Sequence, residues 1–354
     1  MQAKVQEILS SFRAYVEAHD YRKTPILTVY VDIDPTNPDN RKERPAWLIE
    51  LGNERKKIRD ALPEEELKRR ASLEKWAAVE EYLTQHLRHR RPEGRSVVLF
   101  TDLEDYLVID LPVSLPTRIY WGTPQLKHLL FALDMYEKYL TVVFGGAGAD
   151  LHEVFLSRTV GAHSVEGSGP GPERGEKNLA RERRELATER KQTREIAQEI
   201  EDHFRTDSDF RRIVFGGNLK QAHAVKNALH PSIANLVVAM EAMDARITDG
   251  EVAERVTAIA NEVELENDRA VVRNLLEQFH AKGRAVVERQ GVETALQEGR
   301  VRTLVLPYPV PSDEFDPLLI EATLGNAEIE FVYGDAAAKL AEFGGIGAFL
   351  YYAS

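Results

Sequence analysis

The sequence contains no cysteine. Disulfide bonds, thiolate zinc sites and cysteine nucleophiles are therefore excluded, which fits a protein of the reducing cytosol. No run of apolar residues approaches the length that crosses a membrane. The N-terminal segment carries Val5, Leu9, Phe12 and Val16 at helical spacing but lacks the apolar core of a signal peptide. We therefore expect a cytoplasmic protein that does not bind membranes.

Positive charge is also in short supply. The 354 residues include 46 Lys and Arg against 58 Asp and Glu, which gives a net charge of −12. This balance argues against broad, sequence-independent binding to DNA or to other naked nucleic acid. Any contact with RNA must come from a local basic surface that departs from the average.

Patterns typical of catalytic and metal sites are missing as well. The histidines are scattered without the spacing of metal ligands, so we expect no metal and no cofactor. The segment VFGGNLK (214–220) lacks the spacing and the Lys-Ser/Thr ending of a phosphate loop. Its glycines are expected to form a strand-to-helix turn before a helix cap at Asn218. Asp32 and Asp34 are expected to be hydrogen-bonded at a strand end rather than catalytic.

The pattern of the chain is that of an α/β protein, long enough for two or three domains. The first domain is expected over residues 1–130. Its expected elements are, in chain order, a strand at 24–34, helices at 46–60 and 64–90, and strands at 96–100, 105–111 and 118–122. A further helix is expected to open with Thr123 as its cap and Pro124 at its first position.

Two more α/β domains are expected, over residues 131–280 and 281–354. The expected elements of the second are strands at 139–145, 149–157, 158–164, 211–217 and 235–240, and a helix that a capping box at Thr248 and Glu251 opens toward Phe279. The expected elements of the third are a helical segment at 283–301, helices at 315–324 and 335–343, and strands at 302–308, 327–334 and 346–353. The order of elements predicts a mixed sheet with helices on its faces for the second domain. It predicts a compact α/β/α sandwich for the third.

Residues 165–206 stand out within the second domain as a Gly- and Pro-rich loop followed by a long charged helix. Residues 172–194 hold eight Lys or Arg against five Glu, a segment of +3 in a chain of −12. At roughly 100° per residue, four cations fall on one side of this helix: Lys177, Arg181, Arg184 and Lys191. Three glutamates fall on another side, beside an apolar stripe: Glu182, Glu185, Glu189, and Leu179, Leu186 and Ala197.

This pattern leaves two interpretations of the helix open. A cationic face would bind the phosphates of RNA, whereas an ordinary solvated helix would pair its charges along its length. The same choice holds for Arg41, Lys42 and Arg44, which are either an RNA contact or part of a tethered polar loop.

Three quoted segments resemble a known superfamily. ETALQEGRVRTLVLPY (293–308) is similar to the segment that opens the third domain of archaeo-eukaryotic class I release factors and of Pelota. RRIVFGGNLKQAHAVKNAL (211–229) resembles the strand–glycine–helix segment of their middle domain, and TVYVDIDPTNP (28–38) the first strand of divergent bacterial members. These segments occur in the same order as in the superfamily, so the resemblance covers almost the whole chain. The sequence therefore resembles the bacterial archaeo-eukaryotic release factor family.

The resemblance implies three domains, of which the middle one has a ribonuclease H-like fold with 165–206 inserted and the last is a small α/β/α sandwich. Nuclease chemistry needs carboxylates on two metals, usually beginning on the first strand, and the strand at 139–145 has none. In the family, a Gly-Gly-Gln loop enters the peptidyl-transferase centre and positions water against the peptidyl-tRNA ester. The matching loop here carries no such motif, although it retains small and rigid residues: Gly167, Ser168, Gly169, Pro170 and Gly171.

The resulting expectation is a ribosome-binding translation factor without a catalytic residue, which occupies the A site in hibernation or protection. Its partners would be the ribosome, through rRNA or tRNA, and a translational GTPase such as elongation factor Tu. Two alternatives stay open. One is a release or rescue factor that hydrolyses peptidyl-tRNA through a divergent loop, and the other is an adaptor that binds protein rather than RNA.

Overall fold

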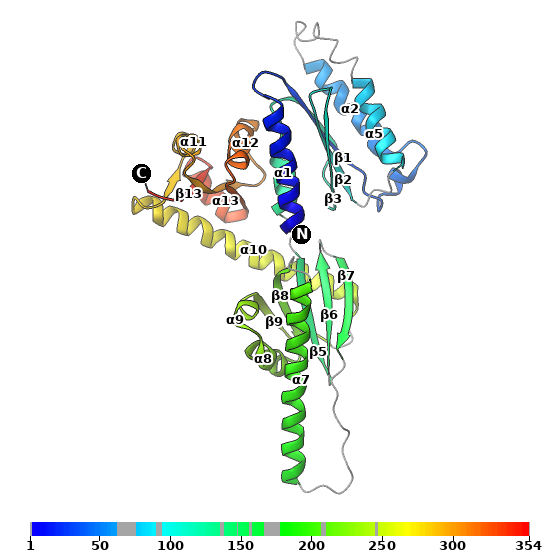
Figure 1. The fold of residues 1–354 in the computed structure, drawn as a ribbon, viewed down its shortest axis with the longest axis vertical. Coiled ribbons are helices and arrows are strands. Elements are labelled where there is room, and N and C mark those ends of the chain that lie inside the picture. The colour runs from blue at the N-terminus through cyan, green and yellow to red at the C-terminus, as the bar shows by residue number, and fades with distance from the viewer. Residues whose placement is uncertain are drawn as a thin grey trace. The chain divides into compact units, whose positions relative to one another are not determined.

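The computed structural model describes residues 2–61, 76–89, 94–134, 138–146, 148–155, 158–165, 178–206, 210–244 and 247–353. The chain divides into two compact units. The middle unit consists of residues 135–267 together with Met1–Gln2, and the split unit of residues 3–134 and 268–354. Over the described residues the chain forms three sheets with helices between their strands, which makes it an α/β protein (Figure 1).

The N-terminal sheet belongs to the split unit and is antiparallel, in the order β3-β2-β1-β4. Its strands are β1 (Ile26–Asp32), β2 (Ser96–Thr101), β3 (Tyr106–Leu111) and β4 (Arg118–Gly122), and its helices are α1 (Gln2–Ala18), α2 (Ala46–Ala61) and α5 (Trp76–His89). The predicted strands are confirmed. Because side chains alternate along a strand, Val29 and Leu99 pack with α2 and α5, whereas Phe100 meets Phe12 of α1 with ring centroids 5.1 Å apart.

Helix α6 (Lys127–Asp134) begins later than the sequence predicts. The expected cap at Thr123 is wrong, because a side chain from the C-terminal segment of the split unit binds the backbone directly before the helix. Leu126 donates its amide hydrogen to Oδ1 of Asp316, 190 residues away, at 3.3 Å. A carboxylate is favoured at a helix N-terminus, where amide groups lack partners within the helix, so this distant residue serves as the cap.

The middle sheet has the order β7-β6-β5-β8-β9. Its strands are β5 (Lys138–Gly145), β6 (Gly148–Phe155), β7 (Arg158–Val165), β8 (Phe210–Gly217) and β9 (Val237–Glu241), and its helices are α7 (Asn178–Thr206), α8 (Leu219–Ala228), α9 (Pro231–Ala234) and the first part of α10 (Asp249–His280). Strands β5, β6 and β7 are antiparallel, whereas β5, β8 and β9 are parallel. Leu140 and Phe144 pack with α7 and α8, and Val143 packs with α10.

Two local signals in the middle unit act as predicted. Asn218 caps α8, since its side-chain oxygen accepts the amide hydrogen of Lys220 at 3.0 Å. Thr248 and Glu251 form the capping box of α10: the amide of Thr248 donates to Oε2 of Glu251 at 2.9 Å, and the amide of Glu251 donates to Oγ1 of Thr248 at 3.4 Å. Both helices start where their own sequence specifies.

The C-terminal sheet belongs to the split unit and has the order β10-β13-β11-β12. Its strands are β10 (Ala285–Val287), β11 (Val301–Pro307), β12 (Glu328–Val332) and β13 (Gly347–Leu350), and its helices are α11 (Arg289–Gln297), the 3-10 helix η2 (Asp313–Phe315), α12 (Asp316–Leu324) and α13 (Gly334–Ala341). A helical segment over 283–301 is wrong in its first part, because Ala285–Val287 pairs with β13. Adjacent valines favour a strand once such a partner is present.

Helix α6 joins the two segments of the split unit. The ring of Phe131 stacks on that of Tyr308 with centroids 3.8 Å apart. Lys127 forms an ion pair with Asp313, and its Nζ lies 3.8 Å from the fully buried carboxylate of Asp316. Residues 3–134 and 268–354 are therefore joined at α6 by both packing and ion pairing.

Candidate nucleic-acid interface

Among the side chains that the structure describes, the buried residues of the long charged helix lie in its C-terminal half. Ile196, Ala197 and Ile200 are buried against the middle sheet. In contrast, Leu186 is 53% exposed. In the predicted apolar stripe Ala197 is therefore buried and Leu186 is not, while the side chain of Leu179, its third residue, lies outside the described part. With 29 residues and a rise of about 1.5 Å each, α7 is about 44 Å long. Figure 1 shows its N-terminal half extending past the strands of the middle sheet.

The exposed half of α7 carries predicted cations. Arg184 and Lys191 are exposed, and Nζ of Lys191 lies 3.5 Å from Glu195 one turn on, as a solvated pair would. Lys177 lies outside the described residues, and for Arg181 the structure describes the helical backbone alone. The predicted loop residues Gly167–Gly171 also lie outside them.

Three more arginines of α7 are exposed, although the sequence analysis did not single them out: Arg183, Arg190 and Arg194. They lie on a different side of the helix from the predicted face at roughly 100° per residue. The signal that could have found them is the high charge of residues 178–195. The charge alone could not show that the packing of α7 against the middle sheet involves Ile196, Ala197 and Ile200 but not Leu186.

The loop that carries Arg41, Lys42 and Arg44 is held by hydrogen bonds and an ion pair to its own residues and to the end of β1. It forms the 3-10 helix η1 (Pro38–Arg41), and Asn40 donates to the carbonyl oxygens of Asp32 and Asp34 at 3.3 and 3.2 Å. Arg41 donates from Nε to the carbonyl of Pro35 at 2.6 Å. Lys42 pairs with Asp39 at 2.6 Å, and Arg44 is exposed at the end of the loop. Arg41 and Lys42 also line a cavity of about 280 Å³ beside Trp47.

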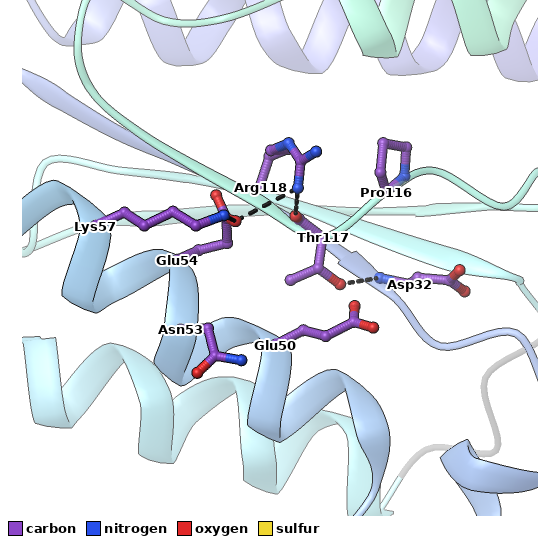
Figure 2. Close-up of a pocket in the computed structure, with 8 residues that line it drawn as sticks. All are labelled: Asp32, Glu50, Asn53, Glu54, Lys57, Pro116, Thr117 and Arg118. Carbon is purple, nitrogen blue, oxygen red and sulfur yellow. Dashed lines mark hydrogen bonds and ion pairs between the residues drawn. The ribbon is translucent and has the colours of Figure 1, made fainter.

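A polar cavity of about 400 Å³ lies between α2 and the start of β4 (Figure 2). Its two cations are paired within the cavity, since Glu54 accepts from Lys57 at 2.5 Å and from Arg118 at 3.4 Å. The Asp32 amide donates to Oγ1 of Thr117 at 3.1 Å. The contact of Arg118 with Glu54 thus joins α2 to the sheet edge, whereas Lys57 pairs within α2.

Asp32 and Asp34 form a hydrogen-bonded strand end, as predicted. Asp34 accepts from the amide of Thr36 at 2.9 Å and from Nε of Arg95 at 2.8 Å. Burial by itself raises the pKa of Asp34, but these bonds outweigh it and lower the pKa to about 2. Its charge is therefore committed to structure.

Carboxylates on β6 of the middle sheet also bind neighbouring side chains. Asp150 accepts from the hydroxyl of Ser164 at 2.6 Å. Glu153 contacts Lys138 at 2.6 Å and His203 at 3.0 Å. These partners give each acid a structural role.

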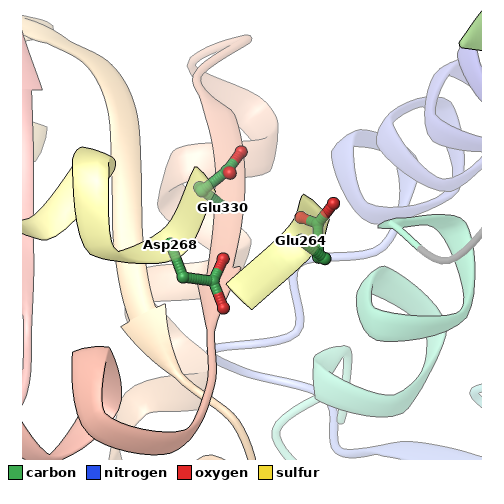
Figure 3. A group of neighbouring side chains, drawn as sticks. All are labelled: Glu264, Asp268 and Glu330. Carbon is green, nitrogen blue, oxygen red and sulfur yellow. The ribbon is translucent and has the colours of Figure 1, made fainter. Parts of the chain in front are cut away.

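Helix α10 carries further acids, drawn in Figure 3 with Glu330 of β12. In the split unit, the buried Asp268 accepts the amide hydrogen of Tyr333 at 2.8 Å, directly before α13. In the middle unit, Glu264 pairs with Arg212 at 2.8 Å. Asp268 thus supports a helix start, and Glu264 takes part in an ion pair.

Residues 124–261 match bacterial archaeo-eukaryotic release factor family 10. Over these residues the chain is similar to this family. The match includes the middle sheet, α7 and the start of α10, and it confirms the resemblance stated from the quoted segments. No curated protein matches this chain. None of its described helices is long and apolar enough to cross a membrane.

Solved structures of translation factors are also similar to this chain. Pelota of Archaeoglobus fulgidus is 16% identical, with 73% of this chain and 79% of that chain covered and a TM-score of 0.37. Dom34 of S. cerevisiae, a translation termination-like factor that interacts with Hbs1, is 12% identical over 71% and 74% of the chains, with a TM-score of 0.48. The archaeal termination factor aRF1 is 16% identical over 98% of both chains, with a TM-score of 0.27.

Proposed function

We propose that this protein is a translation factor of the release-factor kind, which binds the ribosome in the A site and protects it, as in hibernation, without hydrolysing peptidyl-tRNA. The family match over residues 124–261 supports a role in translation. The loop at 166–176 contains no Gly-Gly-Gln, which supports a non-hydrolytic role. In this proposal the loop points toward the peptidyl-transferase centre, and the protein acts in the cytoplasm.

The observation that carries the proposal is the exposed, cationic half of α7. Leu186 is exposed rather than packed against the middle sheet. Because most helical stability comes from packing of an apolar face, this half of α7 adds little to the stability of the fold, and its exposed side chains can contact a partner. The partner of a cationic face is a polyanion, and rRNA or tRNA supplies closely spaced phosphates. The proposed contacts are Lys177, Arg181, Arg184 and Lys191. The basic loop with Arg41, Lys42 and Arg44 is a second proposed RNA contact.

The proposal includes a finer domain layout and a further partner. The strand order of the middle sheet supports a ribonuclease H-like middle domain, and the C-terminal sheet with helices supports the small α/β/α sandwich. The boundaries 1–130, 131–280 and 281–354 stay a prediction. A translational GTPase such as elongation factor Tu is the proposed delivery partner.

Cosedimentation with ribosomes from stationary-phase cells tests the proposal. The full chain should appear in ribosomal fractions, and Lys177, Arg181, Arg184 and Lys191 changed together to Glu should remove it from them. Each lost phosphate contact should also reduce the slope of the logarithm of the binding constant against the logarithm of the salt concentration by about one unit. Absence of the unaltered protein from every ribosomal fraction would contradict the proposal.

The chain offers a matched control on the same helix. Arg183, Arg190 and Arg194 changed to Glu alter the charge of α7 on another side, so they should weaken binding less than reversal of the predicted face. An equal loss would contradict a single RNA-binding face. Unchanged cosedimentation after reversal of the predicted face would favour a protein-binding adaptor. Release of the peptide from peptidyl-tRNA in the same samples would favour the hydrolytic alternative.

A further inference from the structure

A groove lies on the middle unit between the loop that follows β9 and the N-terminal part of α10. Its volume is about 550 Å³, and its apolar part is lined by Ala242, Met243 and Ile247 of the loop and by Ala258 of α10. Met243 and Ile247 pack against the core between the middle sheet and α10. Gly216 of β8 leaves room for the sulfur of Met243 because it has no β-carbon. The groove therefore has an apolar floor that the core holds in place.

The rim of the same groove is acidic. Glu251 and Glu254 line it from α10 and are exposed, and Asp244 lines it from the loop. Glu254 has no ion pair with any residue that the structure describes. Arg255 also lines the groove, but its Nε donates to Oε2 of Glu241 at 2.7 Å. Three carboxylates thus remain on the rim beside a cation that already has its own partner.

The groove and the cationic helix α7 belong to opposite faces of the middle sheet. Leu140 and Phe144 of β5 pack with α7 and α8, whereas Val143 between them packs with α10. An acidic rim repels the phosphates that a cationic helix attracts. The face that carries the groove is therefore suited to a protein partner rather than to a nucleic acid.

We propose that this acidic groove binds a basic segment of a partner protein. An apolar side chain of the segment would lie on Met243 and Ile247, and its Lys or Arg side chains would pair with Glu251 and Glu254. The floor alone would suit any apolar group and the rim alone any cation, but together they favour a chain segment that offers both. The groove shares no residue with α7 or with the basic loop at Arg41, so this inference goes beyond the proposed function.

Fluorescence anisotropy with the full chain tests the acidic groove, with a labelled peptide in which lysines flank a central leucine as the probe. Glu251→Gln with Glu254→Lys changes the charge of the rim and should weaken binding about tenfold. Glutamine at position 251 can still complete the capping box with Thr248, so α10 should keep its start. A peptide with serine in place of the central leucine should bind about tenfold more weakly, because it leaves the apolar floor uncovered.

A second variant tests the occupied space rather than the charge. Ala258→Trp fills part of the groove from α10 and should also weaken peptide binding. Glu262→Lys is the matched control, since it places a reversed charge farther along α10 at an exposed position outside the groove, and it should leave affinity within about twofold. All variants should keep the melting temperature of the unaltered chain.

The outcomes also separate this inference from the proposed function. Reversal of the α7 charges should leave peptide affinity unchanged, whereas Glu251→Gln with Glu254→Lys should leave ribosome cosedimentation through α7 detectable. Equal peptide affinity of this variant and the unaltered chain, or equal affinity of the leucine and serine peptides, would overturn the inference. Self-association of the unaltered chain in sedimentation velocity that Glu254→Lys abolishes would place a second copy in the groove, and it would overturn the inference too.

Discussion

Asp316 and His128 titrate in opposite senses inside the split unit. Burial raises the pKa of Asp316 to about 6, although the charge of Lys127 lowers it. Burial, aided by Lys127, lowers the pKa of His128 to about 4. A carboxyl group with a raised pKa loses its stabilising contribution as the pH rises from 3.8 to about 6. A histidine with a lowered pKa loses its contribution as the pH falls from 6.5 to about 4.

Asp316 and His128 thus change the stability of the fold in opposite directions as the pH falls, and single substitutions should separate the two contributions. Asp316→Asn leaves the histidine slope uncompensated, so the variant should lose up to about 3 kcal/mol more stability than the unaltered chain as the pH falls from about 6.5 to 4. His128→Gln should show the reverse trend over the same range. Urea unfolding at several pH values measures both. Curves parallel to that of the unaltered chain for both variants would contradict the assignment.

Elements whose signals are local were predictable from the sequence, and those completed at a distance were not. The caps at Asn218 and Thr248 lie beside the helices that they start. The start of α6 depends on Asp316, and β10 depends on β13, so no local pattern could locate them. The candidate face of α7 followed from charge and periodicity. The exposure of the N-terminal half of this helix did not follow from the sequence, because Leu186 and the buried Ala197 lie on the same side of the helix and their pattern does not distinguish them.

Helix α7 should respond to a helix-breaking residue according to its half. Ala187→Pro falls in the exposed half, so it should lower the helical circular-dichroism signal and ribosome binding while the melting temperature stays the same. Ala197→Pro interrupts the half packed on the middle sheet and should destabilise the middle unit by about 3 kcal/mol or more. Thermal unfolding and cosedimentation measure the two effects. An equal fall in melting temperature would mean that both halves are packed.

The whole molecule is divided by contacts rather than by chain order. The split unit combines residues 3–134 and 268–354, and α6 supplies part of the contact between them. Residues 1–134 and 268–354, expressed together as separate chains, should therefore copurify. Phe131→Ala removes the ring that stacks on Tyr308 and should weaken this association by about 3–5 kcal/mol if the site does not collapse. Independent elution of the two unaltered fragments would contradict the division.

The order of synthesis gives the cap at Asp316 a further consequence. Chains grow from the N-terminus, and domains tend to fold as they emerge. When α6 leaves the exit tunnel, the carboxylate that caps it and the ring that covers Phe131 have not yet been translated. The whole middle unit must be synthesised before they appear. Until residues 135–267 are translated, α6 lacks its cap and Phe131 lacks its stacking partner, so we expect the nascent N-terminal segment to bind chaperones during that interval.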